Sequence, residues 1–491
     1  MIKKMLSDRL GKIISQAMSS LHGNITPAEL ATDYEIHPQS MLYRLCDWIG
    51  KMTGTIILTP HVQAVGNCGE DVYFGLLKAR REGKKLVILW PYELPGRLKF
   101  RLTNVEVINV ASDYRAVSHD SFVNIAARIL LTAYFAFFRT LSYMHRLFLG
   151  VHLSNVYRIP IIGESTLWQP EGVRDFSWGV VNQYDWPRQL ATPLPVSLTK
   201  KKRLIAEHQR ALLGLPKDAW FVCLHVRESG FHKDTVSERN GNILNYVGAI
   251  EEITSRGGWV VRMGDSTMTR LPVMKGVIDY PFTESKSALM DVYLISQCRL
   301  YIGMMSGIYD VAVLFQRPMI MTNMSNWMWT FPLKKSDLGV MKHVYSKSKN
   351  RFLSVREVLA EPWTVVSFLG MGDEYVLYEN DSDELRAVAK EFFERGVDWE
   401  PTELQRQFNE LRILTGWKII SEEMFNAGNV QPYYSKHVNE YDLLERYRLA
   451  SRLDSAVGVL GSDFLQQNWE VDMMNRKITK LYGCEVVQAD I

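Results

Sequence analysis

Titratable and charged side chains gather at the end of one short, mainly apolar run, residues 221–226. His225, Arg227 and Glu228 stand where this run ends. A histidine can transfer protons near neutral pH, and an arginine can donate two hydrogen bonds to one phosphate group. A short apolar run is typical of a buried strand, so these residues predict a polar site at a strand's carboxyl end.

Similar residues follow the next predicted strands or open the next predicted helices: Arg262, Gly264, Asp265, Asp279, Lys286, Asp291, Ser306 and Gly307. Ligands of open α/β sheets bind beyond the carboxyl ends of the strands, so we expect these residues on one rim. Cationic side chains and helix N-termini favour anions. The rim therefore predicts a phosphorylated ligand, and a nucleotide-sugar diphosphate would fit. Asp265 and Asp291 could hold ribose, a sugar or an arginine, and a purely structural role for Asp291 is equally open.

The elements that would position these residues alternate between strands and helices. In the first half we predict strands at 55–62, 86–90 and 105–110 and helices at 70–81 and 122–149, with Gly66 and Gly69 in a loop. In the second half we predict strands at 221–226, 259–263, 277–280, 299–303 and 319–323, and helices at 243–256, 287–297 and 308–315. This alternation is typical of parallel sheets covered by helices, so the expected class is α/β.

The chain of 491 residues is too long for one compact core. Its pattern predicts an N-terminal amphipathic segment (1–45), a first Rossmann-like domain on the acceptor side (46–200), a second that binds the nucleotide (201–380) and a helical C-terminal extension (381–491). The two doubly wound domains would face each other across a cleft.

Composition excludes several classes of protein. With 47% hydrophobic and 23% charged residues, wholesale disorder is excluded, and a net charge of +3 gives no reason to expect nucleic-acid binding. The five cysteines are scattered without a CxxC pair, so we expect no metal site. The motifs GxGxxG, GxxxxGK[ST], GxSxG and HExxH are missing, which disfavours dinucleotide, Walker-type and common hydrolase sites.

Two segments bear on membrane contact. The longest apolar run, 129–138, is too short to span a bilayer, so it predicts either a buried helix or one that lies against a membrane or partner. Apolar residues at helical spacing over 2–21, with four basic residues among them, could sit on an anionic leaflet or pack on the domain. We expect a cytoplasmic protein, with peripheral membrane contact as an open alternative.

The residues over 213–327 resemble bacterial surface-polysaccharide glycosyltransferases of GT-B type. His225 and Arg227 are similar to the HxRxGD element of GT-B fucosyltransferases, in which the arginine contacts the donor diphosphate. The sequence departs from that element after Arg227, so donor identity does not transfer. Ser306 and Gly307, followed by Pro318, look like the donor-phosphate segment of GT-B enzymes. In the first half, only the loop 59–74 and the strand pattern match.

This resemblance implies a hexosyl- or deoxyhexosyl-transferase in the synthesis of lipopolysaccharide or capsule. It would move sugar from a nucleotide-sugar donor to a glycan or lipid-linked acceptor without a metal or other cofactor. Arg227, Arg262 and Lys286 would stabilise the leaving diphosphate. His225, Gly264, Asp279 and the other rim residues would complete the donor site.

An inverting transfer also needs a general base for the acceptor hydroxyl. His61, Glu70 and Asp71 are the candidates from the first half, and His225 and Glu228 those from the second. Gly66, Asn67 and Gly69 would form an acceptor-side loop, because glycine lets a backbone approach a ligand closely.

Two other classes of function stay open on the sequence. The chain could transfer pyruvyl or phosphoryl groups to polysaccharide on a similar fold. It could also be a non-catalytic component of a glycan-assembly complex that binds partners through its N-terminal and C-terminal helices.

Overall fold

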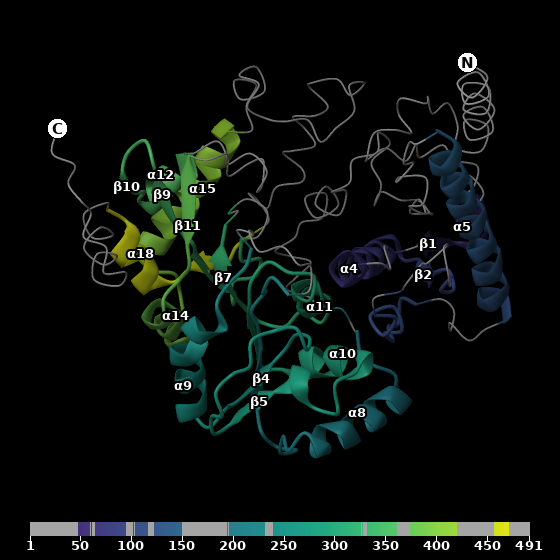
Figure 1. The fold of residues 1–491 in the computed structure, drawn as a ribbon, viewed down its shortest axis with the longest axis horizontal. Helices are drawn as coiled ribbons and strands as arrows, with labels where there is room; N and C mark the ends of the chain where they lie inside the picture. Colours follow the sequence, from purple (N-terminus) through teal and green to yellow (C-terminus); the bar gives the residue numbers. More distant parts are fainter. Residues whose placement is uncertain are drawn as a thin grey trace.

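The computed structural model describes residues 48–58, 60, 64–94, 102, 104–115, 122–149, 194, 196–230, 239–325, 327, 331–360, 374–419 and 456–470. These residues form a mixed α/β structure whose largest element is a parallel sheet (Figure 1). His61 and the segment 1–45 lie outside the described residues.

The large sheet has seven strands in the order β12-β8-β7-β6-β3-β4-β5. All its pairings are parallel. The strands are β3 (Phe221–His225), β4 (Trp259–Arg262), β5 (Val277–Asp279), β6 (Leu300–Gly303), β7 (Met319–Met324), β8 (Leu338–Met341) and β12 (Val459–Leu460). The chain runs outward from β3 to β5, returns to β6 beside β3, and then runs outward the other way. The strand order therefore reverses between β3 and β6, which makes their carboxyl ends a topological switch point.

Strands β3, β6, β7 and β8 are buried along their whole length, because helices cover both faces of this sheet. Helix α14 (Ser382–Glu394) packs on α9 (Val247–Ser255), and α10 (Ala288–Gln297) packs on α8 (Lys200–Leu212) and α11 (Tyr309–Leu314). The two groups lie on opposite sides of the sheet in Figure 1. Short 3₁₀ helices, η3 (Ile243–Tyr246) and η4 (Tyr280–Phe282), precede α9 and follow β5.

The described residues after 381, 382–419 and 456–470, belong to this sheet domain and do not form a separate extension. Strand β12 adds to the sheet beside β8, while α15 (Glu403–Ile419) and α18 (Ser462–Asn468) pack together. Helix α14 begins at a capping box between Asp381 and Glu384, a strong helix-start signal. Its apolar face then packs on α9, so the charged pattern of this region marks only its outer surface.

A second, antiparallel sheet follows β8 and was not predicted. Its strands are β9 (His343–Ser346), β10 (Arg351–Phe352) and β11 (Tyr375–Tyr378), in the order β10-β9-β11. Helix α12 (Val355–Ala360) comes directly after β10. These strands are too short for their alternation to be read from the sequence.

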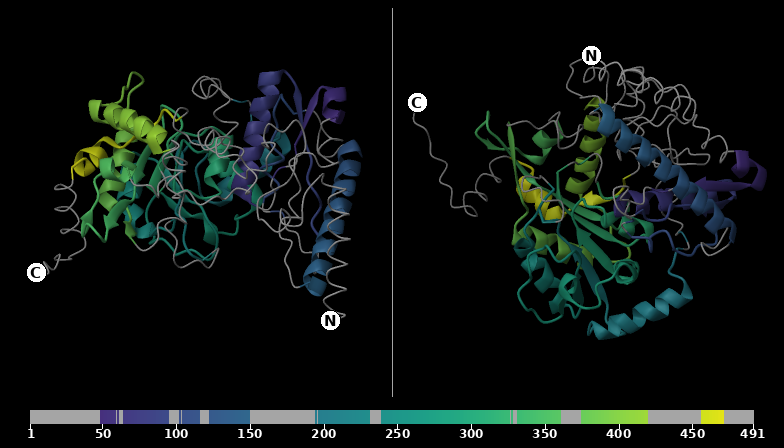
Figure 2. Two further views of the ribbon diagram at one scale, coloured as in Figure 1. Left: turned by 90° about the horizontal axis from the view of Figure 1, so that it is seen from above. Right: turned by 45° about the vertical axis from the view of Figure 1, so that its right-hand side comes forward.

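The first half contributes a smaller parallel unit at the other end of the molecule (Figure 2). Helix α4 (Val65–Glu82) connects β1 (Thr55–Leu58) to β2 (Lys85–Ile88), and the two strands pair in parallel. A two-stranded sheet matches the predicted β-α-β pattern. Within the described residues it does not amount to a complete doubly wound domain, so that part of the expected fold stays a prediction.

The strand predicted at 105–110 is wrong, because residues 105–109 form a turn. The carbonyl of Val105 accepts hydrogen bonds from the backbone N–H groups of Ile108 and Asn109, both at 3.1 Å. The turn buries Val107 and Ile108 in the core without any ladder pairing. Alternating apolar residues were therefore an insufficient signal for a strand.

Helix α5 (Phe122–Leu149) runs along the outer edge of the first unit (Figures 1 and 2). One face is buried through Asn124 and Leu131, while Leu130 and Phe137 are 72% and 51% exposed. The interpretation as a buried helix is therefore right for one face only. In the described part of the chain, no helix has the length and apolar character to cross a bilayer.

Candidate functional site

The switch point brings together two predicted residues from different strands. His225 ends β3 and pairs in register with Gly303, which ends β6. Ser306 follows β6, and its Oγ lies 3.1 Å from His225 Nδ1. The structure therefore brings both residues to one rim, as the sequence predicted, although they are 81 positions apart in the chain.

The environment of His225 keeps its imidazole neutral. The side chain is buried, and this burial, reinforced by Arg262, lowers its pKa from 6.5 to about 3. Asp265 acts in the opposite direction, while Lys286 and Arg227 lower the pKa further. A histidine with so low a pKa is a weak base near neutral pH.

Two further cations meet over the switch point at one residue, Asn240. Arg227 donates from Nη1 to the side-chain oxygen of Asn240, and Lys342 donates from Nζ to its backbone carbonyl at 2.8 Å. Both cations are buried, with 7% and 5% of their surface exposed. Lys342 directly follows β8 and was missed, because its short strand was not recognised in the sequence.

The backbone beside Asn240 packs tightly against both central strands. The N–H of Gly241 donates to the carbonyl of Arg227 at 2.9 Å. A Cβ added at Gly241 would lie 2.7 Å from Sδ of Met304, after β6, and 3.2 Å from a methyl of Val226, after β3. Asn240 is therefore held where the carboxyl ends of β3 and β6 adjoin.

Arg262, predicted to contact the donor diphosphate, lies beneath the rim. It is completely buried and forms ion pairs with Glu228 (3.0 Å) and Asp279 (2.9 Å). It also donates to the carbonyl of Thr269 at 2.9 Å. These contacts join the ends of β3, β4 and β5, so the geometry favours a bracing role over direct phosphate contact.

The carboxylates around Arg262 also hold the loop after β4. Glu228 accepts hydrogen bonds from the N–H and hydroxyl of Thr269, at 2.8 and 2.7 Å, and Asp279 accepts from the N–H of Leu271 at 3.0 Å. In the same loop, Asp265 accepts from the N–H of Thr267 at 2.8 Å. Gly264, at φ +146°, starts this loop. Residues with a side chain rarely adopt this positive φ, so the backbone conformation favours glycine here.

Lys286 and Asp291 form an ion pair with each other beside the ring of Tyr280. Burial raises the pKa of Asp291, and Lys286 opposes this shift. The N-cap of α10 is Ser287, whose hydroxyl accepts from the N–H of Met290. The structure thus supports the structural interpretation of Asp291 and gives Lys286 a carboxylate partner.

The acceptor-side residues are helical, and the loop predicted at 66–69 is wrong. Gly66, Asn67, Gly69 and Glu70 all lie in α4. A Cβ at Gly66 would lie 2.6 Å from Cα of Gly307 and 2.5 Å from a carboxylate oxygen of Asp310, and one at Gly69 would lie 3.2 Å from the carbonyl of Asp310. These glycines therefore let α4 approach the start of α11, directly beside Ser306, and contact between the helices offsets their low helix propensity.

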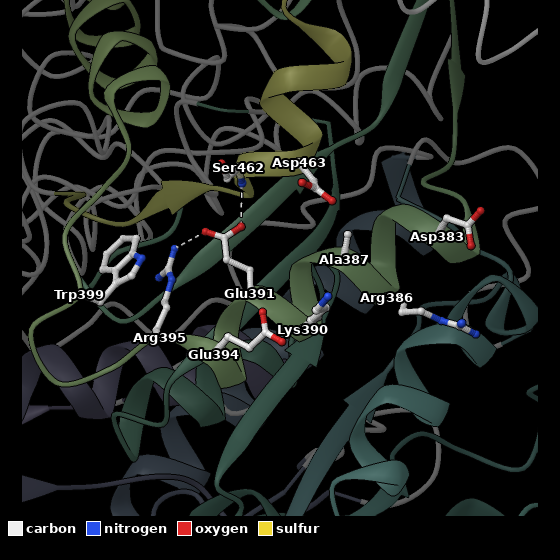
Figure 3. A pocket seen from close by; sticks show the side chains of 10 residues that line it. All are labelled: Asp383, Arg386, Ala387, Lys390, Glu391, Glu394, Arg395, Trp399, Ser462 and Asp463. Atoms are coloured by element: carbon white, nitrogen blue, oxygen red, sulfur yellow. Dashed lines mark hydrogen bonds and ion pairs between the residues drawn. The ribbon is translucent and has the colours of Figure 1, made fainter.

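A hollow of about 480 Å³ lies between α14 and the start of α18, away from the switch point (Figure 3). Its lining contains none of the predicted site residues. Glu391 accepts hydrogen bonds there from Arg395 (2.9 Å) and from the N–H of Ser462 (2.7 Å), so these groups hold α14 to α18. In the part of the chain that the structure describes, no cluster of three or more His, Cys, Asp or Glu side chains could hold a metal ion.

Comparison with known proteins yields distant structural likenesses. No protein-family model and no curated protein matches the chain. It is similar to the glycosyl transferase family 9 protein from Veillonella parvula DSM 2008, with a TM-score of 0.31 and 14% identity over 54% of this chain and 79% of that one. It is also similar to the UDP-GlcNAc 2-epimerase of Methanocaldococcus jannaschii, solved with UDP-GlcNAc and UDP, with a TM-score of 0.20 and 12% identity over 57% of this chain and 64% of that one. Because both TM-scores are low, these likenesses do not identify the function of this chain.

Proposed function

We propose that this protein is a glycosyltransferase whose nucleotide-sugar donor binds at the switch point between β3 and β6. One observation carries the proposal: buried Arg227 and Lys342 meet at Asn240 above the strand ends, beside the pair of His225 and Ser306. Ligands of doubly wound sheets bind at such switch points. Cations there favour a phosphorylated ligand, and a neutral histidine and a serine can hydrogen-bond to its oxygens.

The chemistry requires charge stabilisation at the leaving group. The oxygen of an acceptor hydroxyl attacks the anomeric carbon of the sugar while the bond from that carbon to the phosphate oxygen breaks. The electron pair of the broken bond stays on the phosphate, and the hydroxyl proton passes to a base. Cations already fixed near the phosphate stabilise this charge more in the transition state than in the bound donor.

The base is proposed to come from the first half of the chain. Burial makes His225 a weak base, and the carboxylate of Glu228 is engaged by Arg262 and Thr269. Glu70 lies on α4, the helix that packs beside the switch point, and His61 precedes that helix in the sequence. Both stay proposals, as do a glycan or lipid-linked acceptor, a role in bacterial surface-polysaccharide synthesis and metal independence.

Incubation with a panel of nucleotide sugars tests the proposal directly. We expect one donor to release its nucleotide, slowly by hydrolysis and faster when an acceptor glycan is added. Arg227→Gln should reduce this release at least about 10-fold, because a hydrogen bond to a charged group is lost. Consumption of phosphoenolpyruvate without turnover of any nucleotide sugar would instead identify a pyruvyl transferase.

A further inference from the structure

The side chain of Tyr301 extends along β6 toward the switch point, into the space that a side chain at Gly303 would fill. A Cβ added at Gly303 would lie 2.8 Å from Cε1 of Tyr301 and 2.9 Å from its hydroxyl oxygen. The same Cβ would lie 2.9 Å from the carbonyl oxygen of His225. Glycine at this position therefore leaves room for the tyrosine ring, and the hydroxyl group lies near the carboxyl ends of β3 and β6.

This hydroxyl group is buried in the strand layer. Tyr301 is completely buried, and among the described residues its hydroxyl has no hydrogen bond of ordinary geometry. Ser306 is the side chain that acts on it: burial raises the pKa of Tyr301, and hydrogen bonding with Ser306 opposes this shift. Buried hydroxyl groups rotate to find partners, so Ser306 is the partner that the structure offers to Tyr301.

Ser306 also contacts one of the two ring nitrogens of His225. Its Oγ lies 3.1 Å from Nδ1, whereas Nε2 has no hydrogen bond within the described part of the chain. Burial keeps this imidazole neutral near pH 7, so it carries one proton, on either Nδ1 or Nε2. The hydrogen bond at one nitrogen decides which tautomer forms.

Tyr301 determines the direction of the hydrogen bonds between these three side chains. Its hydroxyl proton has no other acceptor among the described residues, so it points to Oγ of Ser306. Ser306 then donates its own proton to Nδ1 of His225, and the imidazole proton lies on Nε2. In the opposite tautomer, Nδ1–H and Tyr301 would both donate to Ser306, and the serine proton would have no acceptor among these three side chains.

We propose that Tyr301 positions His225 through Ser306, so that the imidazole presents its Nε2–H group to the ligand as a hydrogen-bond donor. This inference rests on the proposed function and deepens it. Nε2–H would donate to an oxygen of the leaving phosphate and stabilise the charge that develops there. An imidazole in this tautomer has no free nitrogen lone pair, so His225 cannot also accept the proton of the acceptor hydroxyl.

Nuclear magnetic resonance of the full chain with isotope-labelled histidine tests the tautomer, because the chemical shifts of the ring carbons differ between the two neutral forms and the cation. The signal of His225 is the one that disappears in His225→Asn. In wild-type protein at pH 7 we expect the Nε2–H form. Tyr301→Phe retains the ring and removes the hydroxyl group. It should reduce the ratio of Nε2–H to Nδ1–H about fivefold, as expected for the loss of one hydrogen bond.

A double variant separates positioning from a general effect on the structure. Ser306→Ala should reduce the ratio at least as much as Tyr301→Phe. Adding Tyr301→Phe to Ser306→Ala should then change nothing further, because the tyrosine acts through the serine. Additive effects of the two substitutions would overturn the proposal.

Tyr246→Phe is the matched control, because Tyr246 is also completely buried but its hydroxyl bonds to Thr322 at 2.6 Å. It should leave the tautomer ratio of His225 unchanged, and a decrease equal to that in Tyr301→Phe would overturn the proposal. If Tyr301→Phe does not fold, wild-type protein still decides. A predominant Nδ1–H form, or a cation at pH 7, would overturn the proposal.

Turnover of the nucleotide sugar that the panel identifies tests the contact with the ligand. Tyr301→Phe should reduce kcat about fivefold and leave KM within about twofold, because the hydrogen bond strengthens as the phosphate gains charge. An unchanged kcat with an altered tautomer ratio would overturn the contact between Nε2–H and the ligand.

Failure of the positioning role and failure of the proposed function give different results. Turnover of a nucleotide sugar with an unchanged tautomer ratio in Tyr301→Phe would remove the positioning role and retain the transferase. A ratio that depends on Tyr301, without turnover of any nucleotide sugar, would retain the positioning of His225 and remove the transferase. An unchanged ratio without any turnover would overturn both.

Discussion

At the carboxyl edge of the large sheet, the cations of two regions have different hydrogen-bonding partners. Near β4 and β5, Arg262 meets Glu228 and Asp279, and Lys286 meets Asp291. At the switch point, Arg227 and Lys342 meet an amide. A carboxylate neutralises a cation and ties elements together, whereas Asn240 gathers two cations at one residue. The comparison teaches that position on the rim does not by itself make a cation a ligand-binding residue.

The largest expected effect of a substitution in the first region is on stability. Arg262→Met should reduce the free energy of unfolding by about 3–5 kcal/mol, because it leaves two carboxylates facing each other in a largely buried site. Denaturant unfolding measures the change. Arg262→Lys, which retains the charge but not the two-sided geometry, should lie between wild type and Arg262→Met. Unchanged stability together with lost nucleotide binding would show that Arg262 contacts the ligand, as proposed for the cations at the switch point.

His225 links the two regions through pH. Its pKa is about 3 when folded and near 6.5 when unfolded, so the unfolded state binds more protons between these values. The stabilising contribution is therefore complete above pH 6.5 and is lost as the pH falls toward 3. At pH 4.5 the loss should be about 2–3 kcal/mol relative to pH 7. Because carboxylates titrate in the same range, the measurement is the difference between wild type and His225→Asn.

In His225→Asn, the decrease in unfolding free energy between pH 7 and pH 4.5 should be smaller than in wild type by that amount. Identical pH profiles would show that the imidazole is hydrated and titrates normally. His225 would then be a candidate general base again, and the assignment of the base to the first half of the chain would lose its main support.

The contact between α4 and α11 gives a smaller effect, and it bears on how the first half reaches the switch point. Gly66→Ala should reduce the free energy of unfolding by about 1–3 kcal/mol, because the new methyl group would overlap Gly307. Gly396→Ala is the control, since a Cβ there meets nothing within 4 Å and should change stability little. Urea unfolding of both variants tests the difference. A neutral Gly66→Ala would mean that α4 is not pressed against α11.

The two regions also differ in how far the sequence predicted them. Strands β3 to β7 are apolar runs between turns and helices, so their places along the chain and their carboxyl ends could be predicted, and His225 and Ser306 were expected on one rim. Strand β8 was not recognised as a strand, so nothing in the sequence singled out Lys342 at its carboxyl end. Asn240 lies outside any strand or helix, and its role depends on cations from two distant strands.

Partners of charged groups were a second limit of prediction. Arg262 follows β4 as a ligand-binding arginine would, but its pairing with Glu228 and Asp279 depends on the lateral order of β3, β4 and β5. Gly66 and Gly69 were read as loop residues because glycine disfavours helix. Only the packing of α4 on α11 shows why a helix contains them.

The smallest expected effect comes from the exposed end of the first region. Lys286→Gln removes one partner of an ion pair whose side chains are 28% and 21% exposed, so stability should fall by less than about 1 kcal/mol. Nucleotide affinity should stay within about twofold of wild type, since Asp291 already neutralises this lysine. Calorimetric titration of Lys286→Gln beside Lys342→Gln makes the comparison under the same conditions. If both variants lose nucleotide affinity equally, the ion pair with Asp291 does not withdraw Lys286 from the ligand, and the whole rim acts as one electrostatic site.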